Sequence, residues 1–432
     1  MKKPYFCAVI GKNFGDEGKG LAVDYLADVP GKVLVIRHNG GAQSGHTVDR
    51  SDKRFIFHEL STGSFRHADT FWADTYFPDL YKLGEELDAF YELEGFRPAI
   101  YADMNAKITI IDDVLLNMAA ESVRGSHRHG SCGMGIYEAQ CRSDGGFAIT
   151  IKELLDRTEE ECLETLREIR TVYLPRRIKE LQEELWELRK ATGLQDNMQQ
   201  RSETAELLSI FPEEYAELLQ SDAVLENAVR EIYHNLQYVK PVKDVASFLQ
   251  GYDRIIFENG QGLLLDSENA EFSPHVTASR TGLTNPCIFL ARWKFTLDEV
   301  VYVTRSYVTR HGAGPLPGEC SKEELGIVEE DVTNSDNPWQ GSLRYARHES
   351  AECFVASVQE DLKNIMEHNL PAPDCSLMMT HLNETGHCVL CREGDYPVGD
   401  FCKLPAVHTT FGRFYISASR YAEDIKFMKQ FL

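Results

Sequence analysis

The sequence contains no long hydrophobic run. None of its apolar stretches reaches the roughly 18 residues that a membrane-spanning helix needs. The opening segment MKKPYFCAVIGKN carries two lysines, but its apolar part is too short for a signal peptide. Internal repeats, low-complexity tracts and Pro/Gly-rich linkers are also absent. We therefore expect an ordinary globular protein of the cytoplasm that does not bind a membrane.

Positive charge is scarce. The chain has 45 lysines and arginines against 68 aspartates and glutamates, which gives a formal net charge of −23. A protein that follows nucleic-acid phosphates needs lysine and arginine clustered along one face, so we expect no nucleic-acid partner. A small anionic ligand can still bind where positive groups are concentrated in one pocket.

The cysteines lack the pattern of a disulfide framework. Their number, 11, is odd, and they are scattered from Cys7 to Cys402, which is typical of reduced thiols. Cys388 and Cys391 have the CxxC spacing of metal or redox sites, but no second CxxC accompanies them. A structural role is the preferred interpretation, and a metal or redox role stays open.

Short β-rich runs alternate with helical stretches along most of the chain. The runs KVLVIRHNG, RIIFENGQG and EVVYVTRSYVTR each end in a glycine-containing or polar turn. This alternation predicts an α/β fold with a large, mostly parallel central sheet flanked by helices.

Residues 151–240 differ from this pattern. Leucines and isoleucines recur there at three- and four-residue spacing between charged residues, at positions Leu163, Leu166, Ile169, Ile178, Leu181, Leu185 and Leu188. The segment is predicted to be a helical subdomain in which Pro175 separates two helices. We expect scaffold or dimer surface from it rather than catalysis.

The first candidate site is a glycine-rich loop, VIGKNFGDEGKG at residues 9–20. It lies between an apolar run and a helical pattern, where glycine amides, a helix N-terminus and Lys19 could hold phosphate. The usual phosphate-loop pattern has a hydroxyl residue after the lysine, but that position is Gly20. On the residues alone, phosphate binding and a tight structural turn are both open, and the acidic pair Asp16 and Glu17 is unexplained.

A second loop lies in VLVIRHNGGAQSGHTV at residues 33–48. Parallel strands place their carboxyl-terminal loops side by side, so this loop can face the first one across a single crevice. His46 stands there between a glycine and a threonine. Beside a phosphate site we interpret this histidine as functional rather than structural.

These two loops resemble the paired signature of the adenylosuccinate synthetase family, ligases that join aspartate to the 6-position of inosine monophosphate (IMP). Further matches follow in the family's order: HGSCGMGIYEAQCR, FENGQGLLLD, SPHVTAS, TRHGAGPLPGE and QGSLRYAR. The resemblance implies one domain over residues 1–432 with a phosphate-loop-like nucleotide-binding turn. The helical subdomain at 151–240 is longer than is usual for the family.

The resemblance also implies a mechanism. Enzymes of this family deprotonate N1 of the purine, transfer the γ-phosphoryl group of a nucleoside triphosphate to O6, and let the amine of aspartate displace phosphate. By motif position, Asp16 resembles the general base and a magnesium ligand, and His46 resembles the general acid at the 6-oxyanion. The Gly45 carbonyl would complete the metal shell. A magnesium-dependent homodimer is implied.

The binding residues carry over by motif position. Those implied for the triphosphate are Gly15, Glu17, Gly18, Lys19, Gly20, Gly45 and Thr47. Those implied for the purine monophosphate are Gln43, Ser131, Cys132, Arg142, Gln261, Thr277 and Arg344, with Arg142 resembling an arginine that reaches in from the other subunit. Gln43 stands where the family commonly has asparagine, and Ser131-Cys132 replaces a Thr-Thr pair. A turn role for Gln261 and solvation for the arginines are the alternatives.

Two departures affect substrate choice. The aspartate-binding loop of the family carries closely spaced arginines, and here it retains Ser342, Arg344 and Arg347 but has Ala346 at one arginine position. The family reads guanine with a Thr-Lys-x-Asp stretch, whereas this chain has His381 and Asn383 in MTHLNE, with Ser417 in the segment that packs over the base. An asparagine amide can pair with adenine, so we hypothesise that ATP is preferred over GTP.

Three other functions stay open. Viral relatives that act on deoxyguanylate use an adenine nucleotide, but that branch is understood to replace the catalytic aspartate with a smaller residue. Asp16 is retained here, which favours a purine without a 2-amino group, such as IMP. A purine-nucleotide NTPase or kinase without amino-acid ligation is a second alternative, and a non-catalytic nucleotide sensor is a third.

Overall fold

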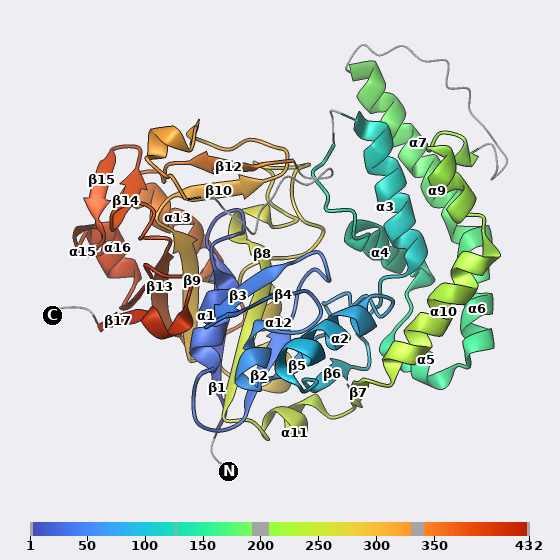
Figure 1. Cartoon of the computed structure of the whole chain (residues 1–432), viewed down its shortest axis with the longest axis horizontal. Helices are drawn as coiled ribbons and strands as arrows, with labels where there is room; N and C mark the ends of the chain where they lie inside the picture. Colours follow the sequence, from blue (N-terminus) through green and yellow to red (C-terminus); the bar gives the residue numbers. More distant parts are fainter. Residues whose placement is uncertain (1–2, 126–127, 192–206, 330–340, 430–432) are drawn as a thin grey trace.

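The computed structural model describes residues 3–125, 128–191, 207–329 and 341–429. Its centre is a ten-stranded sheet in the order β17-β16-β13-β9-β1-β8-β2-β5-β6-β7 (Figure 1). The strands are β1 (Tyr5–Gly11), β2 (Val33–Arg37), β5 (Asp69–Trp72), β6 (Ile100–Asp103), β7 (Val239–Val242), β8 (Arg254–Gly262), β9 (Glu299–Arg305), β13 (Asp374–Thr380), β16 (Arg413–Ile416) and β17 (Lys426–Lys429). All neighbouring pairs are parallel except β16 and β17. The predicted α/β class is confirmed.

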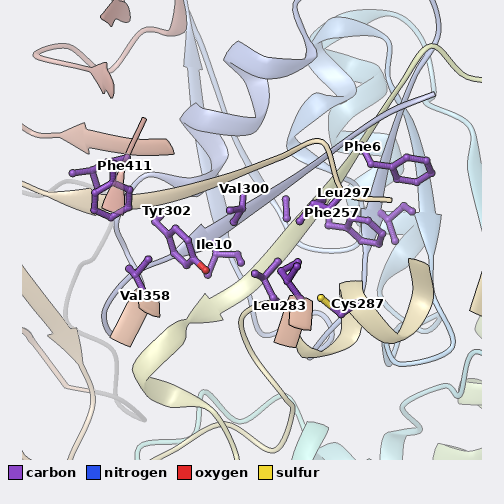
Figure 2. Close-up of a cluster of buried hydrophobic side chains, with 14 of the residues drawn as sticks. Phe6, Ile10, Phe257, Leu283, Cys287, Leu297, Val300, Tyr302, Val358 and Phe411 are labelled. Atoms are coloured by element: carbon purple, nitrogen blue, oxygen red, sulfur yellow. The ribbon is translucent and has the colours of Figure 1, made fainter. Parts of the chain in front are cut away.

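The inner strands are buried on both faces, as their apolar runs require. Along β1, Phe6, Ala8 and Ile10 enter one hydrophobic cluster, whereas Cys7 and Val9 enter the cluster on the opposite face. Figure 2 shows the first cluster, where Phe6 and Ile10 lie with Phe257 of β8 and Tyr302 of β9. The covering helices are α12 (Thr284–Trp293), α13 (Ala351–Asp361), α14 (Lys363–Glu367), α15 (Val398–Phe401) and α16 (Pro405–Thr410) on this face, and α1 (Lys19–Ala27) on the other.

The order in which the chain adds strands to the sheet changes direction at β1. From this central strand the chain runs through α1 to β2 on one side, and β9 later pairs with the other side of β1. In open parallel sheets, ligands bind beyond the carboxyl ends of the strands at such a switch point. The loops that follow β1, β2, β8, β9, β13 and β16 all emerge at this edge. Both loops singled out from the sequence are among them.

Smaller elements surround this edge. They are the hairpin β3 (His46–Arg50) and β4 (Lys53–Phe57), the three-stranded sheet β10 (Val308–His311), β12 (Leu343–Ala346) and β11 (Glu319–Cys320), and the hairpin β14 (Cys388–Cys391) and β15 (Gly394–Pro397). The cysteines of β14, like the other nine in the chain, are free thiols. No helix among the described residues combines the length and hydrophobicity of a membrane span.

The helical region lies beside the sheet, away from the C-terminal part (Figure 1). It contains α3 (Ile111–Arg124), α4 (Ile136–Arg142), α5 (Ile151–Asp156), α6 (Glu159–Glu168), α7 (Leu174–Ala191), α9 (Glu213–Leu218) and α10 (Asp222–Leu236), and α2 (Leu83–Glu94) and α11 (Val245–Leu249) flank the sheet. Leucines of α3 and α7 share one core. Residues 239–242, at the end of the predicted helical segment, instead form β7.

The predicted helix break at Pro175 is wrong. A π-helical turn over Ile169–Tyr173 joins α6 to α7, so helix continues from Glu159 to Ala191. Proline lacks an N–H group, and its ring crowds the carbonyl four residues earlier. The wider π turn lies at that point and accommodates Pro175 without ending the helix.

Candidate functional site

The turn after β1 has an unusual backbone. Gly15, Asp16 and Gly18 have φ angles of +99°, +58° and +92°. Glycine adopts this left-handed region freely, whereas for aspartate it is strained and persists only when neighbouring groups hold it. The Asp16 carbonyl accepts a hydrogen bond from Nε of Arg305 at 2.6 Å. The Asp16 carboxylate is half-buried and has no hydrogen-bond partner among the described residues, so it is free for a ligand.

The second acidic residue of the turn faces inward. One carboxylate oxygen of Glu17 accepts the amide protons of Asn13 and Gly15, both at 2.9 Å, and the other lies 3.1 Å from Nζ of Lys19. The side chains of Glu17 and Lys19 are each 2% exposed. The Glu17 carboxylate and the Gly15 amide are thus paired within the loop. The predicted contacts of these two residues with a triphosphate stay predictions. Lys19 keeps further N–H groups for a phosphate.

The glycine after Lys19 is required by packing. A Cβ atom at Gly20 would lie 2.9 Å from the carbonyl oxygen of Thr47 and 3.2 Å from Cγ2 of Thr62. A serine or threonine therefore does not fit where the usual phosphate loop has one. Close packing of α1 against β3 therefore explains this glycine, and the predicted contact of Gly20 with a nucleotide stays a prediction. At Gly18, the last residue before α1, a Cβ atom would meet Cγ2 of Thr380 at 3.3 Å.

His46 is held by a buried carboxylate. Its Nδ1 lies 2.7 Å from Oε1 of Glu258 on β8, and its Nε2 lies 3.1 Å from the carbonyl oxygen of Gly260. Glu258 also accepts hydrogen bonds from the backbone and hydroxyl of Thr62, and Arg37 lies 3.9 Å away. Burial alone would raise the pKa of Glu258, but the positive charge of Arg37 and the hydrogen bond from His46 lower it to about 2. Burial lowers the pKa of His46, and Glu258 opposes that shift.

Sequence reasoning missed Glu258, although its motif was recognised. The signal was a carboxylate at the end of the apolar run RIIFE. Arg305, which ends the buried strand EVVYVTR and fixes Asp16, was missed in the same way. A charged residue that ends an apolar strand at the carboxyl edge lies next to the site, because all parallel strands end there.

Two glutamines converge over a glycine. A Cβ atom at Gly40 would lie 2.6 Å from Nε2 of Gln43 and 2.9 Å from Nε2 of Gln261. Gln261 accepts a hydrogen bond from Asn39 at 3.0 Å. Oε1 of Gln43 and Nε2 of Gln261 are buried without hydrogen-bond partners among the described residues. Buried polar atoms are normally satisfied, so this acceptor and donor can serve a ligand.

The predicted monophosphate loop lies against a neighbouring glycine turn. The Ser131 hydroxyl donates to Asn117 at 2.8 Å, and burial raises the pKa of the Cys132 thiol to about 11. A Cβ atom at Gly130 would lie 2.9 Å from the amide nitrogen of Ala313. Thr277 is half-buried, and its amide donates to the carbonyl of Leu265. The structure thus places this loop beside the 312–315 turn.

Arg142 does not reach toward another subunit. It is fully buried on α4, where its guanidinium donates to Asp113 at 2.8–3.2 Å and to the carbonyls of Ile108 and Phe147. These contacts favour a structural role, and the predicted role in substrate binding stays a prediction. Motif alignment across a short deletion gave the position but not the direction of the side chain.

A substitution separates the two roles. Arg142→Lys is expected to lower the free energy of unfolding by about 1.5–3 kcal/mol, because a lysine cannot make the bidentate pair and the two carbonyl bonds together. The KM for the purine monophosphate should not change. Denaturant unfolding and steady-state kinetics measure the two effects, and a large rise in KM at unchanged stability would contradict the structural role.

The two arginines of the predicted aspartate loop contact different groups. Arg344 donates to Glu319 at 2.8 Å and to the carbonyl of Gly314 at 2.7 Å. Arg347 instead donates to the carbonyl of Cys391 and to the carboxylate of Asp395 at the β14–β15 hairpin. Ala346 is fully buried in the cluster of Phe14. The structure therefore does not bring Arg347 to the position of the missing arginine. Ser342 is exposed.

The predicted base-reading segments are neighbours. The backbone N–H of Leu382 donates to the carbonyl of Ser417, because the loops follow the parallel strands β13 and β16. Nδ1 of His381, whose φ is +59°, lies 2.8 Å from the hydroxyl of Thr380. Asn383 is exposed, and Ser417 is buried with its hydroxyl donating to the carbonyl of Ser419 at 2.7 Å. An exposed amide at this edge can face a base.

A divalent cation would find few protein ligands here. No group of three or more His, Cys, Asp or Glu side chains with metal-binding geometry occurs in the described part of the chain. The donors available are the Asp16 carboxylate and backbone carbonyls such as that of Gly45, which is exposed. These oxygen donors suit magnesium, which usually takes one or two carboxylates and fills the rest of its shell with water and substrate phosphates.

Two curated relatives are similar to this chain in sequence. The adenylosuccinate synthetases of Acaryochloris marina and Desulfitobacterium hafniense are both 27% identical to it, over 74% and 73% of its length. The matches span 64% and 65% of those relatives, so the chain covers just under two thirds of the proteins it matches.

Solved structures share the fold. The fully ligated adenylosuccinate synthetase of Plasmodium falciparum has a TM-score of 0.63 at 17% identity, covering 98% of this chain and 99% of that chain. The succinoaminodeoxyadenylate synthetase of cyanophage S-2L, bound to dGMP and to dATP as an energy donor, has a TM-score of 0.58 at 14% identity, covering 98% and 95%. A family model described as adenylosuccinate synthetase matches residues 8–335. The chain belongs to the adenylosuccinate synthetase family.

Proposed function

We propose that the chain is a ligase that joins L-aspartate to the 6-position of a 6-oxopurine nucleotide, with IMP as the purine and adenylosuccinate as the product. The observation that carries this proposal is the placement of two side chains at the carboxyl edge of one sheet. The unpartnered carboxylate of Asp16 lies in the loop after β1, and His46, held by the Glu258 carboxylate, follows the loop after β2. A binding module has no need for an acid and a base at one site. Family membership supports the same reaction class.

The chain's own residues account for the proton transfers. Asp16 accepts the N1 proton of the purine. The charge that develops on O6 is met by the Nε2–H group of His46, which exchanges its contact with the Gly260 carbonyl for one with O6. O6 then takes the γ-phosphoryl group, the aspartate amine attacks C6, and phosphate leaves. Glu258 fixes the ring of His46 from the other side. Asp16 and the Gly45 carbonyl would hold magnesium, which neutralises charge on the transferred phosphoryl group when bound.

A substrate matrix tests this function. IMP, GMP and dGMP are each combined with ATP or GTP, with and without aspartate. The masses of the products are then measured by mass spectrometry. We expect the mass of adenylosuccinate from IMP, and only with aspartate and a triphosphate present. Phosphate release that does not depend on aspartate would instead support an NTPase or kinase. Turnover of dGMP alone would support a relative of the 2-aminoadenine pathway.

The amino donor and the assembly belong to the same proposal. Arg344 and Ser342 remain the candidates for the aspartate carboxylates, since Arg347 lies at another hairpin. A homodimer, dependence on magnesium and a cytoplasmic location are proposed from the family, and sedimentation and chelation experiments test the first two.

ATP is the proposed phosphoryl donor. Asn383 is exposed beside the Ser417 segment, and an amide can donate to N1 of adenine while accepting from its N6 amine. A carboxylate instead accepts both the N1–H and the N2–H of guanine. Asn383→Asp is therefore expected to raise the ratio of kcat/KM for GTP over ATP by at least about tenfold, the scale of one or two base hydrogen bonds. Kinetics with both nucleotides measure this ratio.

The matched control is Asn369→Asp, which adds the same charge at an exposed position after α14. It should leave the ratio unchanged. If wild-type protein already prefers GTP by tenfold or more, the assignment of ATP is wrong.

A further inference from the structure

The strained turn at Asp16 is held by the ends of two adjacent strands. Nε of Arg305, the last residue of β9, donates to the Asp16 carbonyl at 2.6 Å. The hydroxyl of Thr380, the last residue of β13, donates to the next carbonyl, that of Glu17, at 2.8 Å. Arg305 and Thr380 are partners in the sheet register. Two successive carbonyls of the turn are thus fixed from one side, which keeps an aspartate in a conformation that favours glycine.

Arg305 is itself oriented by a buried tyrosine. Its NH1 group donates to the hydroxyl of Tyr307 at 2.9 Å, and that hydroxyl donates to a carboxylate oxygen of Glu384. Arg305 and Tyr307 are 4% and 1% exposed. Burial raises the pKa of Tyr307 far above the physiological range, so its hydroxyl keeps the proton it donates. A continuous series of hydrogen bonds therefore leads from Glu384 through Tyr307 and Arg305 to Asp16.

Glu384 belongs to the segment proposed to read the donor base. It follows Asn383 directly, and the same segment is fastened to β9 by a second set of contacts. The Ser306 hydroxyl donates to the carbonyl of His381 at 3.1 Å, and the Thr385 hydroxyl donates to Ser306 at 3.0 Å. The base-reading segment and the support of Asp16 are therefore one connected unit.

We propose that Tyr307 and Glu384 are positioning residues that orient Asp16 through Arg305 and so connect the base-reading segment to the reacting centre. The inference rests on the proposed role of Asp16 as the base. Neither residue touches the purine in this proposal. Each acts by fixing the main chain that carries Asp16.

The test is a double-mutant cycle. Tyr307→Phe removes one hydroxyl and is expected to lower kcat about tenfold, the scale expected for a slightly misplaced catalytic group, with little change in the KM for the purine monophosphate. In an Asp16→Asn background the same substitution should change kcat less than about twofold, because the group it positions is gone. Glu384→Gln should follow the same pattern. An equal effect in both backgrounds would overturn the proposal.

The control is Tyr415→Phe on β16, which removes a buried hydroxyl that donates to Glu299 of β9 at 2.9 Å. It should leave kcat unchanged, and thermal unfolding checks both variants for stability. A second measurement does not need ligase activity: amide hydrogen exchange at residues 15–18 should accelerate in Tyr307→Phe but not in Tyr415→Phe. If the wild type makes no adenylosuccinate, the proposed function fails, and unchanged exchange in Tyr307→Phe would still overturn this inference separately.

Discussion

Replacing Asp16 with asparagine is expected to lower kcat by about two to four orders of magnitude while nucleotide affinity changes little. Asparagine has the same shape as aspartate but cannot take the N1 proton. It also tolerates the left-handed backbone at φ +58°, so the turn should keep its conformation. The hydrogen bond from Arg305 goes to the main chain and survives the substitution.

The measurements are steady-state kinetics with IMP, ATP and aspartate, and calorimetric titration of each nucleotide. His46→Asn should lower kcat similarly, because it removes the group that supports the oxyanion. Near-normal turnover in Asp16→Asn would refute the assignment of the base.

Glu17→Gln is a matched control for Asp16→Asn within the same loop. Its carboxylate is buried against Lys19 and two loop amides, so its loss should weaken the fold and triphosphate binding together. Asp16→Asn should instead affect turnover alone. This contrast separates a residue that faces the substrate from one that builds the loop.

The sequence predicted the elements that local patterns determine. Apolar runs ending in glycine turns are enough to predict a parallel sheet and the two loops that meet at its carboxyl edge. The roles of single side chains were harder to predict from the sequence. Motif position places Glu17 and Arg142 at the site, but their direction is set by Lys19 and Asp113, and no alignment contains those contacts.

Contacts between segments far apart in the chain also could not be predicted from the sequence. Glu258 lies 212 residues from His46, and Arg305 lies 289 residues from Asp16. Each pair meets only because parallel strands bring their carboxyl ends together. Charged residues that end apolar strands are therefore the pattern to search for in this fold, since they point to the partners of catalytic groups.

Glu258→Ala is expected to destabilise the protein by about 3–5 kcal/mol, because the variant leaves Arg37 buried without its nearest carboxylate. Both side chains are fully buried, and Glu258 has a pKa of about 2, below its ordinary value of 4.5. A carboxylate with a lowered pKa stabilises the fold above the ordinary pKa, and the stabilisation is lost as the pH falls from about 4.5 toward 2. Denaturant unfolding at several pH values should therefore show a smaller acid dependence in the variant.

Glu258→Gln isolates the effect on His46. Glu258 opposes the lowering of the His46 pKa, so a neutral glutamine should let that pKa fall further. If protonated His46 supports the 6-oxyanion, the limb of the kcat/KM profile that declines as pH rises should move to lower pH, and kcat at neutral pH should fall. Glu59→Gln is the control: burial raises the pKa of Glu59 to about 8, so this carboxyl is mostly neutral at pH 7 and its amide carries the same charge. A profile that shifts equally in both variants would show that burial, rather than the Glu258 charge, determines the protonation of His46.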